Sequence, residues 1–276
     1  MPPLLTSIGT FKQNLSGSAF EALAAATGDS LSIPDFREGS RGFVEQVISA
    51  NDAHKMEVAV YSPLFGDNQY GLRLQHQFNP TVSAAGGVSQ LLLPDELDIP
   101  VYSTDTLNVQ VNGTASDNAD VVLQVYYEDR PGAAQRLANW ESIVNNIRSV
   151  LGIEVTVTPG TTGNYGTSVA INANDDRLHA DRDYAVLGMT SDQPVTSIGL
   201  RGPDTSNFRI CCPCHYDERH SSNYFIHQDT QRPSPHIPIL NSNNKGTTLL
   251  DGISAKNVGA TKVSVIMAEL ASKFPG

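Results

Sequence analysis

Residues 119–128 read ADVVLQVYYE, and residues 260–269 read ATKVSVIMAE. In the first stretch Val121, Leu123, Val125 and Tyr127 alternate with their neighbours, so they share one face of an extended chain. Such alternation is typical of an antiparallel strand with one face in a hydrophobic core. Because a similar pattern recurs in the second half of the chain, the two stretches point to an internal duplication.

Four further pairs of landmarks follow the same order in both halves. They are Gly28 with Gly152, VISAND (47–52) with AINAND (170–175), Gly71-Leu72-Arg73 with Gly199-Leu200-Arg201, and Ile99-Pro100 with Ile237-Pro238. This shared order predicts a tandem duplication. The spacing grows most between the Gly-Leu-Arg and Ile-Pro pairs, which places ICCPCHYDERH (210–220) in a loop insertion of the second copy alone.

Each copy is expected to begin with a short helix. In the first, Ser18 and Glu21 form a capping box ahead of the alanine-rich stretch, and Gly28 ends the helix. In the second, apolar residues recur at the three-to-four-residue spacing of a helix that buries one face: Leu137, Trp140, Ile143, Ile147, Val150 and Leu151.

After each predicted helix, short segments of alternating or β-branched residues are separated by Gly, Pro, Asn and Asp. In the first copy these segments lie near residues 30–34, 43–49, 56–62, 70–76, 88–93, 99–103, 105–112 and 119–127. Eight short antiparallel strands are typical of a sandwich or jelly roll. We therefore expect a mainly β fold of two tandem eight-stranded antiparallel β-sandwich, jelly-roll-like units, each preceded by a short α-helix. The helix and first unit occupy residues 1–130. A linker helix and the second unit, with its Cys/His loop, occupy residues 131–276.

Composition narrows the classes of function. Eighteen basic and 29 acidic residues give a net charge of −11, which disfavours direct binding to nucleic acid. Residues 1–18 have no basic segment followed by an apolar run, so no signal peptide is predicted and synthesis in a cytoplasm is expected. No run of eighteen apolar residues predicts a transmembrane segment. Three cysteines within four positions do not make a framework of long-range disulfides.

The stretch at 210–220 carries the chemically distinctive side chains. Cys211, Cys214 and His215 match the C-x-x-C-H pattern of covalent haem attachment, but two β units without an export signal argue against a cytochrome. Cys211, Cys214, His215 and His220 are candidate zinc ligands, although no second C-x-x-C pair accompanies them. The favoured interpretation is a loop of reduced thiols and surface histidines around Pro213, with no cofactor.

Catalytic motifs are missing from the sequence. It contains no G-x-S-x-G, H-E-x-x-H or G-x-x-x-x-G-K-[ST] pattern, so no enzymatic activity is expected. Arg73 and Arg201, from the two Gly-Leu-Arg landmarks, are interpreted as partners in ion pairs.

Two tandem eight-stranded units joined by a short helical segment resemble the double jelly-roll major capsid proteins of tailless icosahedral viruses with internal membranes. The resemblance implies homotrimers with a pseudo-hexagonal outline, assembly into an icosahedral shell, location in the virion, contacts with other virion proteins and no catalysis. One alternative is a non-catalytic β-sandwich binding module, carbohydrate-binding or adhesin-like, that stacks sugars on its tyrosines. Another is a small metal-binding β protein.

Overall fold

The computed structural model describes residues 3–35, 40–52, 54–61, 71–76, 89–94, 97–129, 134–161, 163–214, 221–232 and 234–275. Within these residues the fold is mainly β, with several antiparallel sheets. None of the helices they form is long and apolar enough to cross a membrane.

The first half of the chain forms two sheets that enclose one hydrophobic core. The first sheet has the order β3 (Ala24–Ala25), β1 (Leu4–Lys12), β10 (Ala119–Tyr127), β4 (Gly42–Asn51), β7 (Gln90–Leu91), and β8 (Ile99–Val101) also pairs with β4. The second sheet has the order β2 (Glu21–Ala22), β9 (Asn108–Gly113), β5 (Met56–Tyr61), β6 (Leu72–His76). Val121, Leu123 and Val125 of the first sheet meet Val58 and Val109 of the second in this core.

The second half forms another pair of sheets around its own core. The third sheet has the order β11 (Leu137–Ala138), β18 (Ile237–Asn241), β15 (Asp183–Ser191), β20 (Thr261–Leu270), β12 (Ile147–Val157). The fourth has the order β13 (Gly160–Thr161), β19 (Leu249–Ser254), β16 (Ser197–Arg201), β17 (Ile210–Pro213), and β14 (Val169–Ala170) also pairs with β19. Among these pairings only β13 with β19 is parallel.

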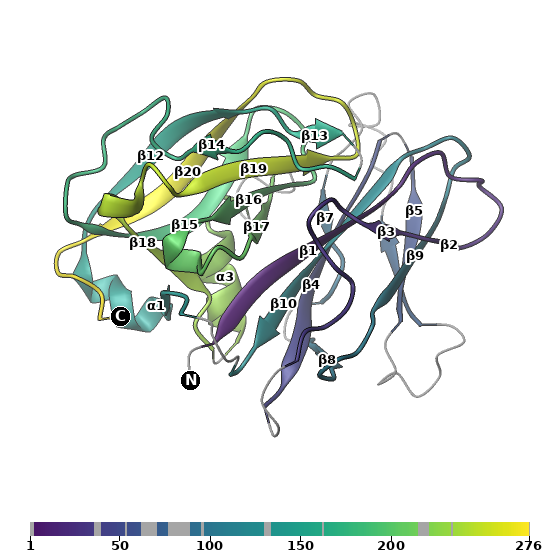
Figure 1. Ribbon diagram of the computed structural model, residues 1–276, viewed down its shortest axis with the longest axis horizontal. Helices are drawn as coiled ribbons and strands as arrows, with labels where there is room; N and C mark the ends of the chain where they lie inside the picture. Colours follow the sequence, from purple (N-terminus) through teal and green to yellow (C-terminus); the bar gives the residue numbers. More distant parts are fainter. Residues whose placement is uncertain are drawn as a thin grey trace.

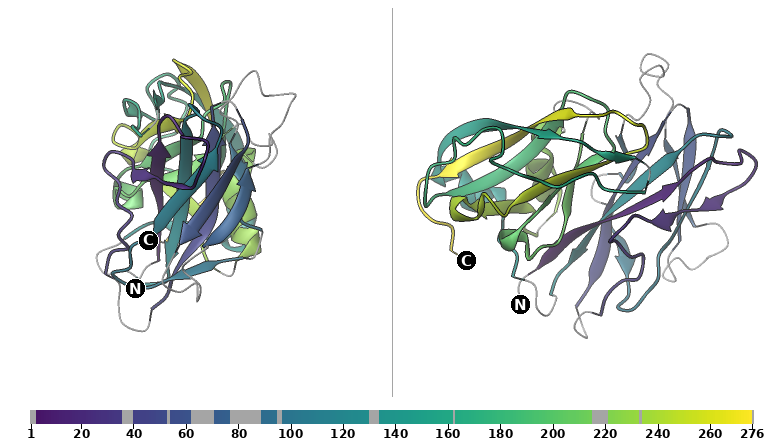
Figure 2. Two further views of the ribbon diagram at one scale, coloured as in Figure 1. Left: turned by 90° about the vertical axis from the view of Figure 1, so that its right-hand side faces the viewer. Right: turned by 45° about the horizontal axis from the view of Figure 1, so that its top comes forward.

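Short helices complete the second half. They are α1 (Trp140–Ile143), η1 (Val144–Asn146), η2 (Pro203–Thr205), α3 (Tyr224–Gln231) and η3 (Ser242–Asn244). Figure 1 shows the strands of the two halves side by side, with α3 and β17 on the side of the second half that faces β1, β10 and β4. The right-hand view of Figure 2 shows the same arrangement after the molecule is tilted.

Both predicted helices are wrong in their main part. Residues 21–25 form β2 and β3, because Leu23 enters the first core and its amide donates to the carbonyl of Val109 in β9 (2.9 Å). In the second half, helix α1 is a single turn and β12 begins at Ile147. Tertiary pairing with neighbouring strands thus overrides the helix propensity of the alanine-rich stretch.

The landmark pairs agree with the structure in part. Stretches 119–128 and 260–269 lie in β10 and β20, each a central strand, and the two Ile-Pro pairs lie in β8 and β18. The other three pairs do not match. VISAND ends strand β4 whereas AINAND enters a turn, and Gly28 lies in a turn whereas Gly152 lies within β12. The two Gly-Leu-Arg stretches lead into or lie in β6 and β16, which occupy different positions in their sheets. The predicted boundary at residues 130–131 lies outside the described residues.

Candidate functional site: the seam between the two halves

The two halves meet where the outer face of the first sheet packs against β17 and α3, a contact that we call the seam. Leu5 of β1 and Tyr126 of β10 belong to the same buried cluster as Tyr224 and Phe225 of α3. A smaller apolar cluster spans the seam: Ala26, Ile48, Val122, Cys211 and Ile253. The outer face of the first sheet is therefore a second buried surface of the first half.

Backbone hydrogen bonds also cross the seam along β1. The amide of Ser7 donates to the carbonyl of Arg209 (2.8 Å), and the amide of Cys211 donates to Ser7 Oγ (2.8 Å). The side chain of Gln135 accepts from the amide of Leu5 (2.7 Å) and donates to its carbonyl (2.8 Å). Because β3 pairs only with Thr10 and Phe11, the rest of this edge of β1 is open, and the second half occupies its polar groups.

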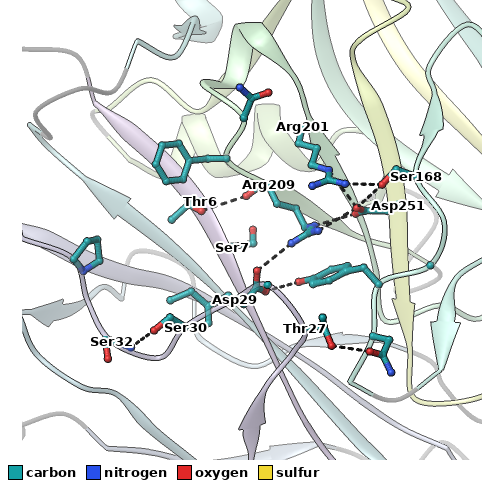
Figure 3. Close-up of a pocket in the computed structure, with 18 of the residues that line it drawn as sticks. Thr6, Ser7, Thr27, Asp29, Ser30, Ser32, Ser168, Arg201, Arg209 and Asp251 are labelled. Carbon is teal, nitrogen blue, oxygen red and sulfur yellow. Dashed lines mark hydrogen bonds and ion pairs between the residues drawn. The ribbon is translucent and has the colours of Figure 1, made fainter.

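A buried ionic network around Arg209 lies at one end of the seam (Figure 3). Arg209 donates to Asp29 Oδ1 at 3.0 Å, and to both oxygens of Asp251 at 2.9 and 3.1 Å. Its guanidinium carbon lies 3.4 Å from the centroid of the Tyr165 ring. Tyr165 Oη in turn donates to Asp29 Oδ2 (2.9 Å). Because Asp29 belongs to the first half and the other three residues to the second, the network joins the halves.

The surroundings of the network shift the pKa values of Asp29 and Arg209. Burial raises the pKa of Asp29, although the amide of Gly9 and the charge of Arg209 act in the opposite direction. Burial tends to lower the pKa of Arg209, but the hydrogen bonds and charge of Asp251 outweigh that effect and raise the pKa. Arg209 therefore stays charged. Its loss would leave the buried Asp29 without its cation and would leave Asp251 with Arg201 alone.

The same end of the seam contains a cavity of about 610 Å³, with walls from both halves. Two arginines, Arg201 and Arg209, balance two carboxylates, Asp29 and Asp251, and the four are linked by ion pairs. The rest of the polar wall consists of hydroxyl and amide side chains: Thr6, Ser7, Thr27, Ser30, Ser32, Asn164, Ser168 and Asn207. With its charges paired internally, the cavity suits an uncharged polar molecule better than an ion.

A second buried ionic group crosses the seam between α3 and β4. Arg232 donates to the carbonyl of Glu45 (2.7 Å) and to Asp98 Oδ1 (3.0 Å), and His236 Nε2 lies 2.8 Å from Glu45 Oε2. The side chains of Arg232, His236 and Glu45 are at most 3% exposed. Such buried charges are tolerated only when they are paired, so this group also fixes the position of one half on the other.

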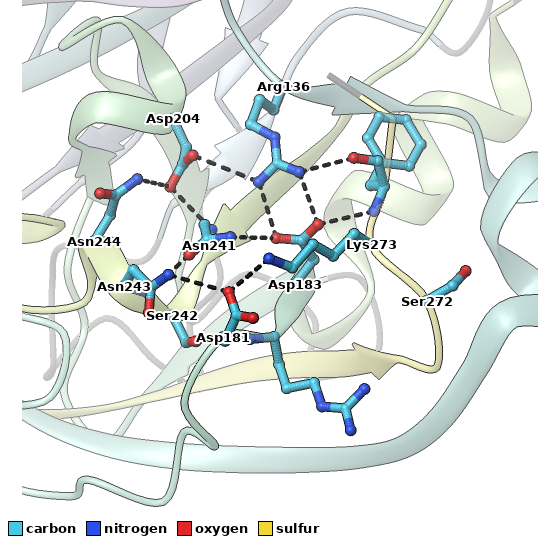
Figure 4. A network of polar contacts seen from close by, with 12 residues as sticks. Arg136, Asp181, Asp183, Asp204, Asn241, Ser242, Asn243, Asn244, Ser272 and Lys273 are labelled. Atoms are coloured by element: carbon cyan, nitrogen blue, oxygen red, sulfur yellow. Dashed lines mark hydrogen bonds and ion pairs between the residues drawn. The ribbon is translucent and has the colours of Figure 1, made fainter.

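The linker is tied to the body of the second half by a network around Arg136 (Figure 4). Arg136 forms two hydrogen bonds with Asp183 (3.0 and 2.8 Å), lies 3.6 Å from Asp204, and donates to the carbonyl of Phe274 (3.1 Å). Burial tends to raise the pKa of Asp183, but the hydrogen bonds from Arg136 and from the Phe274 amide outweigh it and lower the pKa. The guanidinium group of Arg136 thus pairs with the carboxylates of both Asp183 and Asp204.

Cys211 and Cys212 lie in the buried strand β17 and Cys214 follows it, so the predicted exposed loop is wrong at these positions. Cys211, Cys212 and Cys214 are all free and buried. Cys211 belongs to the apolar cluster of the seam, whereas Cys212 and Cys214 belong to the core of the second half. Burial raises the pKa of Cys211 to about 11 and that of Cys214 to about 12, which disfavours the thiolate that a metal requires.

The predicted zinc ligands are placed only in part. His215 and His220 lie outside the described residues, and Cys211 and Cys214 belong to different apolar clusters. Within the described ranges, no group of three or more His, Cys, Asp and Glu side chains is arranged to hold a metal ion. Of the two landmark arginines, Arg201 forms an ion pair with Asp251 (3.5 Å) and Arg73 stacks on Phe20.

Sequence reasoning missed the residues that join the halves. Arg209 and Asp29 are 180 positions apart, and Glu45 and His236 are 191 apart, so no local motif connects them. The available signal was weak: charged residues such as Glu45 stand within otherwise apolar strands, where burial requires a partner.

Comparisons with known proteins reveal only loose similarity. No family model and no curated protein matches the chain. Among solved structures, it is similar to the major capsid protein P2 from bacteriophage PM2, with 10% identity, 97% of each chain covered and a TM-score of 0.23. It is also similar to the PBSX exported protein XepA, with 9% identity, coverage of 94% of this chain and 88% of that chain, and a TM-score of 0.18. Likeness at this level does not identify a function.

Proposed function

We propose that this chain is a structural virion protein, a major capsid subunit built from two tandem jelly-roll units. In this proposal it assembles as homotrimers with a pseudo-hexagonal outline into an icosahedral shell. Other virion proteins are its natural partners, and the role includes neither catalysis nor a cofactor.

The observation that carries the proposal is the strand order. In the first half, β1-β10-β4-β8 lies opposite β2-β9-β5-β6, and in the second half β12-β20-β15-β18 lies opposite β13-β19-β16-β17. In each half the first long strand pairs with the last, which is the connectivity of Greek-key and jelly-roll sandwiches. Two alike units in one chain offer similar side surfaces, so three chains can form a ring with six similar corners.

The seam supports the same role. A shell subunit must hold its two units in a fixed orientation, since small rotations would change the curvature of the assembly. Here apolar packing, the Arg209 network and the Glu45 group all cross the seam. The pair of units is therefore locked by contacts at several places.

The test is the mass of the purified chain by light scattering over a range of concentrations, with negative-stain images of the same fractions. Stable trimers or closed particles are expected. Arg209→Met, which removes a buried cation of the seam, should reduce the trimer fraction, whereas Lys273→Met at an exposed ion pair should not. A chain that remains monomeric at every concentration would contradict the capsid role.

The cavity favours a second candidate function, a binding module for an uncharged polyhydroxylated ligand such as a saccharide. Its volume lies in the range of small-ligand pockets, and its walls carry hydroxyl, amide and aromatic groups. Calorimetric titration with a panel of neutral oligosaccharides tests this function. Ser30→Leu, which narrows the cavity, should weaken binding, whereas Ser272→Leu, away from it, should not. Absence of binding across the panel would remove this candidate.

A further inference from the structure

The seam contains a carboxyl group whose hydrogen bonding is incomplete. Asp120 of β10 is fully buried, beside Phe11 of β1 and Ala50 of β4. Its Oδ2 accepts a hydrogen bond from Thr196 Oγ1 of the second half (3.2 Å). Its Oδ1 is buried and has no hydrogen-bond partner within the described part of the chain. An ionised carboxylate at such a place is costly, because one hydroxyl replaces a full shell of water.

The charged groups around Asp120 do not compensate for this burial. Asp52, which follows β4, acts on Asp120 as a like charge, and Asp117 beyond it is paired with His54 (2.9 Å). On β1, Lys12 forms its ion pair with Glu21 (3.3 Å). From the second half, Asp120 receives the neutral hydroxyl of Thr196, which also accepts from the amide of Ala255 (3.2 Å). Among the described residues, no cation forms an ion pair with Asp120.

We propose that Asp120 makes the contact between the two halves sensitive to pH. The contact is most stable when this carboxyl is protonated, and it becomes less stable when the carboxyl ionises. The proposal goes beyond the capsid role, because it concerns the two halves of one chain and holds whether or not copies assemble.

The direction of the pH dependence follows from the burial. Desolvation, with the charge of Asp52, raises the pKa of Asp120 from 3.8 to about 7, while the Thr196 hydrogen bond lowers it in part. At pH values between 3.8 and about 7, Asp120 is protonated while the seam is closed and loses its proton once the seam opens and water reaches the carboxyl. The closed seam is therefore most stable at acidic pH, and it loses stability as the pH rises from about 4 to about 7. Above that range the loss is complete and no further change is expected.

The experiment is hydrogen exchange of the purified chain at pH 5 and pH 8, comparing the wild type with Asp120→Asn. The informative amides are those of Ser7, bonded to the carbonyl of Arg209, and Cys211, bonded to Ser7 Oγ. Comparison at equal pH cancels the intrinsic pH dependence of exchange. The wild-type to variant ratio of exchange rates at these amides should be at least about tenfold larger at pH 8 than at pH 5.

Two controls make the result specific. The buried amide of Asp120→Asn itself lowers the stability of the seam, but by the same amount at both pH values. It therefore does not affect how the ratio of exchange rates changes with pH. Glu154→Gln, at an exposed carboxyl of β12, should give the same ratio at pH 5 and pH 8. A pH-independent ratio for Asp120→Asn would overturn the proposal. An equal change in β20, far from the seam, would overturn it as well, because the carboxyl would then act on the whole fold.

Discussion

Strand β10 of the first sheet and strand β12 of the third sheet are both long, yet β10 is buried on both faces whereas β12 has one face in water. β10 is buried along its whole length, because one of its faces lines the first core and the other packs against the second half. In β12, residues 148–150 are all exposed, and from Gly152 on the exposed residues alternate with the buried Ile153, Val155 and Val157. The sequence accounts for the exposed face of β12, where Glu154 and Thr156 alternate with apolar residues, but not for the buried outer face of β10, which carries Asp120 and Gln124.

The edges of these sheets differ in the same way. The second half closes the edge of β1 with its own backbone and with Gln135. The edge of β12 is capped by side chains of one turn: Asn174 accepts from the amide of Thr156 (2.8 Å), and Arg177 donates to the carbonyl of Gly152. Such capping protects an edge strand from pairing with another chain. The second half thus covers both the outer face of the first sheet and the open edge of β1. In the proposed assembly, we expect contacts between copies at other surfaces.

The largest expected effect comes from removing the cation of the Arg209 network. Arg209→Met leaves Asp29 and Asp251 buried without their shared partner, which should lower the free energy of unfolding by about 3–5 kcal/mol in urea denaturation. Arg201→Met, at a side chain that is 38% exposed, should cost about 1 kcal/mol or less. Equal losses for the two variants would show that the seam does not depend on the Arg209 network.

Glycines in β1 and β12, the first long strand of each half, provide a matched pair of substitutions. A Cβ at Gly9 would lie 2.5 Å from Tyr165 Oη, across the seam, so Gly9→Ala should cost about 1–3 kcal/mol of unfolding free energy. A Cβ at Gly152 would meet only Ile266 Cδ1 at 3.4 Å, so Gly152→Ala should change stability by about 0.5 kcal/mol or less. The two melting temperatures check this directly, and a destabilised Gly152→Ala would contradict the assignment of its face as open.

Valines on the two faces give a smaller contrast. Val122→Thr inserts a hydroxyl into the apolar cluster of the seam and should cost about 1–3 kcal/mol in urea denaturation. Val150→Thr makes the same chemical change at a side chain that is 59% exposed, where about 0.5 kcal/mol or less is expected. If both variants unfold at the same urea concentration, Val122 is more accessible to water than the packing indicates.

Among the sequence signals, the alternation of apolar residues predicted the observed strands best. Residues 119–127 form β10 as predicted, and the predicted segments 43–49 and 56–62 match β4 and β5 closely, because alternation and β-branching act locally. The prediction of a helix in the alanine-rich stretch after Ser18 is wrong, because pairing with β1 and β9 outweighs its helix propensity. Residues 137–151 were predicted as a helix because the spacing of Ile147 and Leu151 fits a helix as well as a strand, but both residues lie in β12.

The seam was much harder to predict than the strands. Asp120, Gln124 and Tyr126 alternate with core residues, so the sequence places them on the solvent side of a half-buried strand. Their burial depends on which surface of the second half covers them, and that is a property of the whole fold. The cysteines show the same limit, because a motif that suggests a metal loop is here a strand between two apolar clusters.

The smallest effect is expected on the open face of β12 and β20. Glu154 and Lys262 lie 3.3 Å apart with more than half of each side chain exposed, so Glu154→Gln should cost about 0.5 kcal/mol or less. Water and salt screen this pair, so the loss should vanish in about 1 M sodium chloride, where the Debye length is about 3 Å. The loss from Arg209→Met should persist there, because ions do not reach the buried network. Urea denaturation of both variants at low and high salt separates the two faces, and similar salt sensitivity would contradict the burial of the seam.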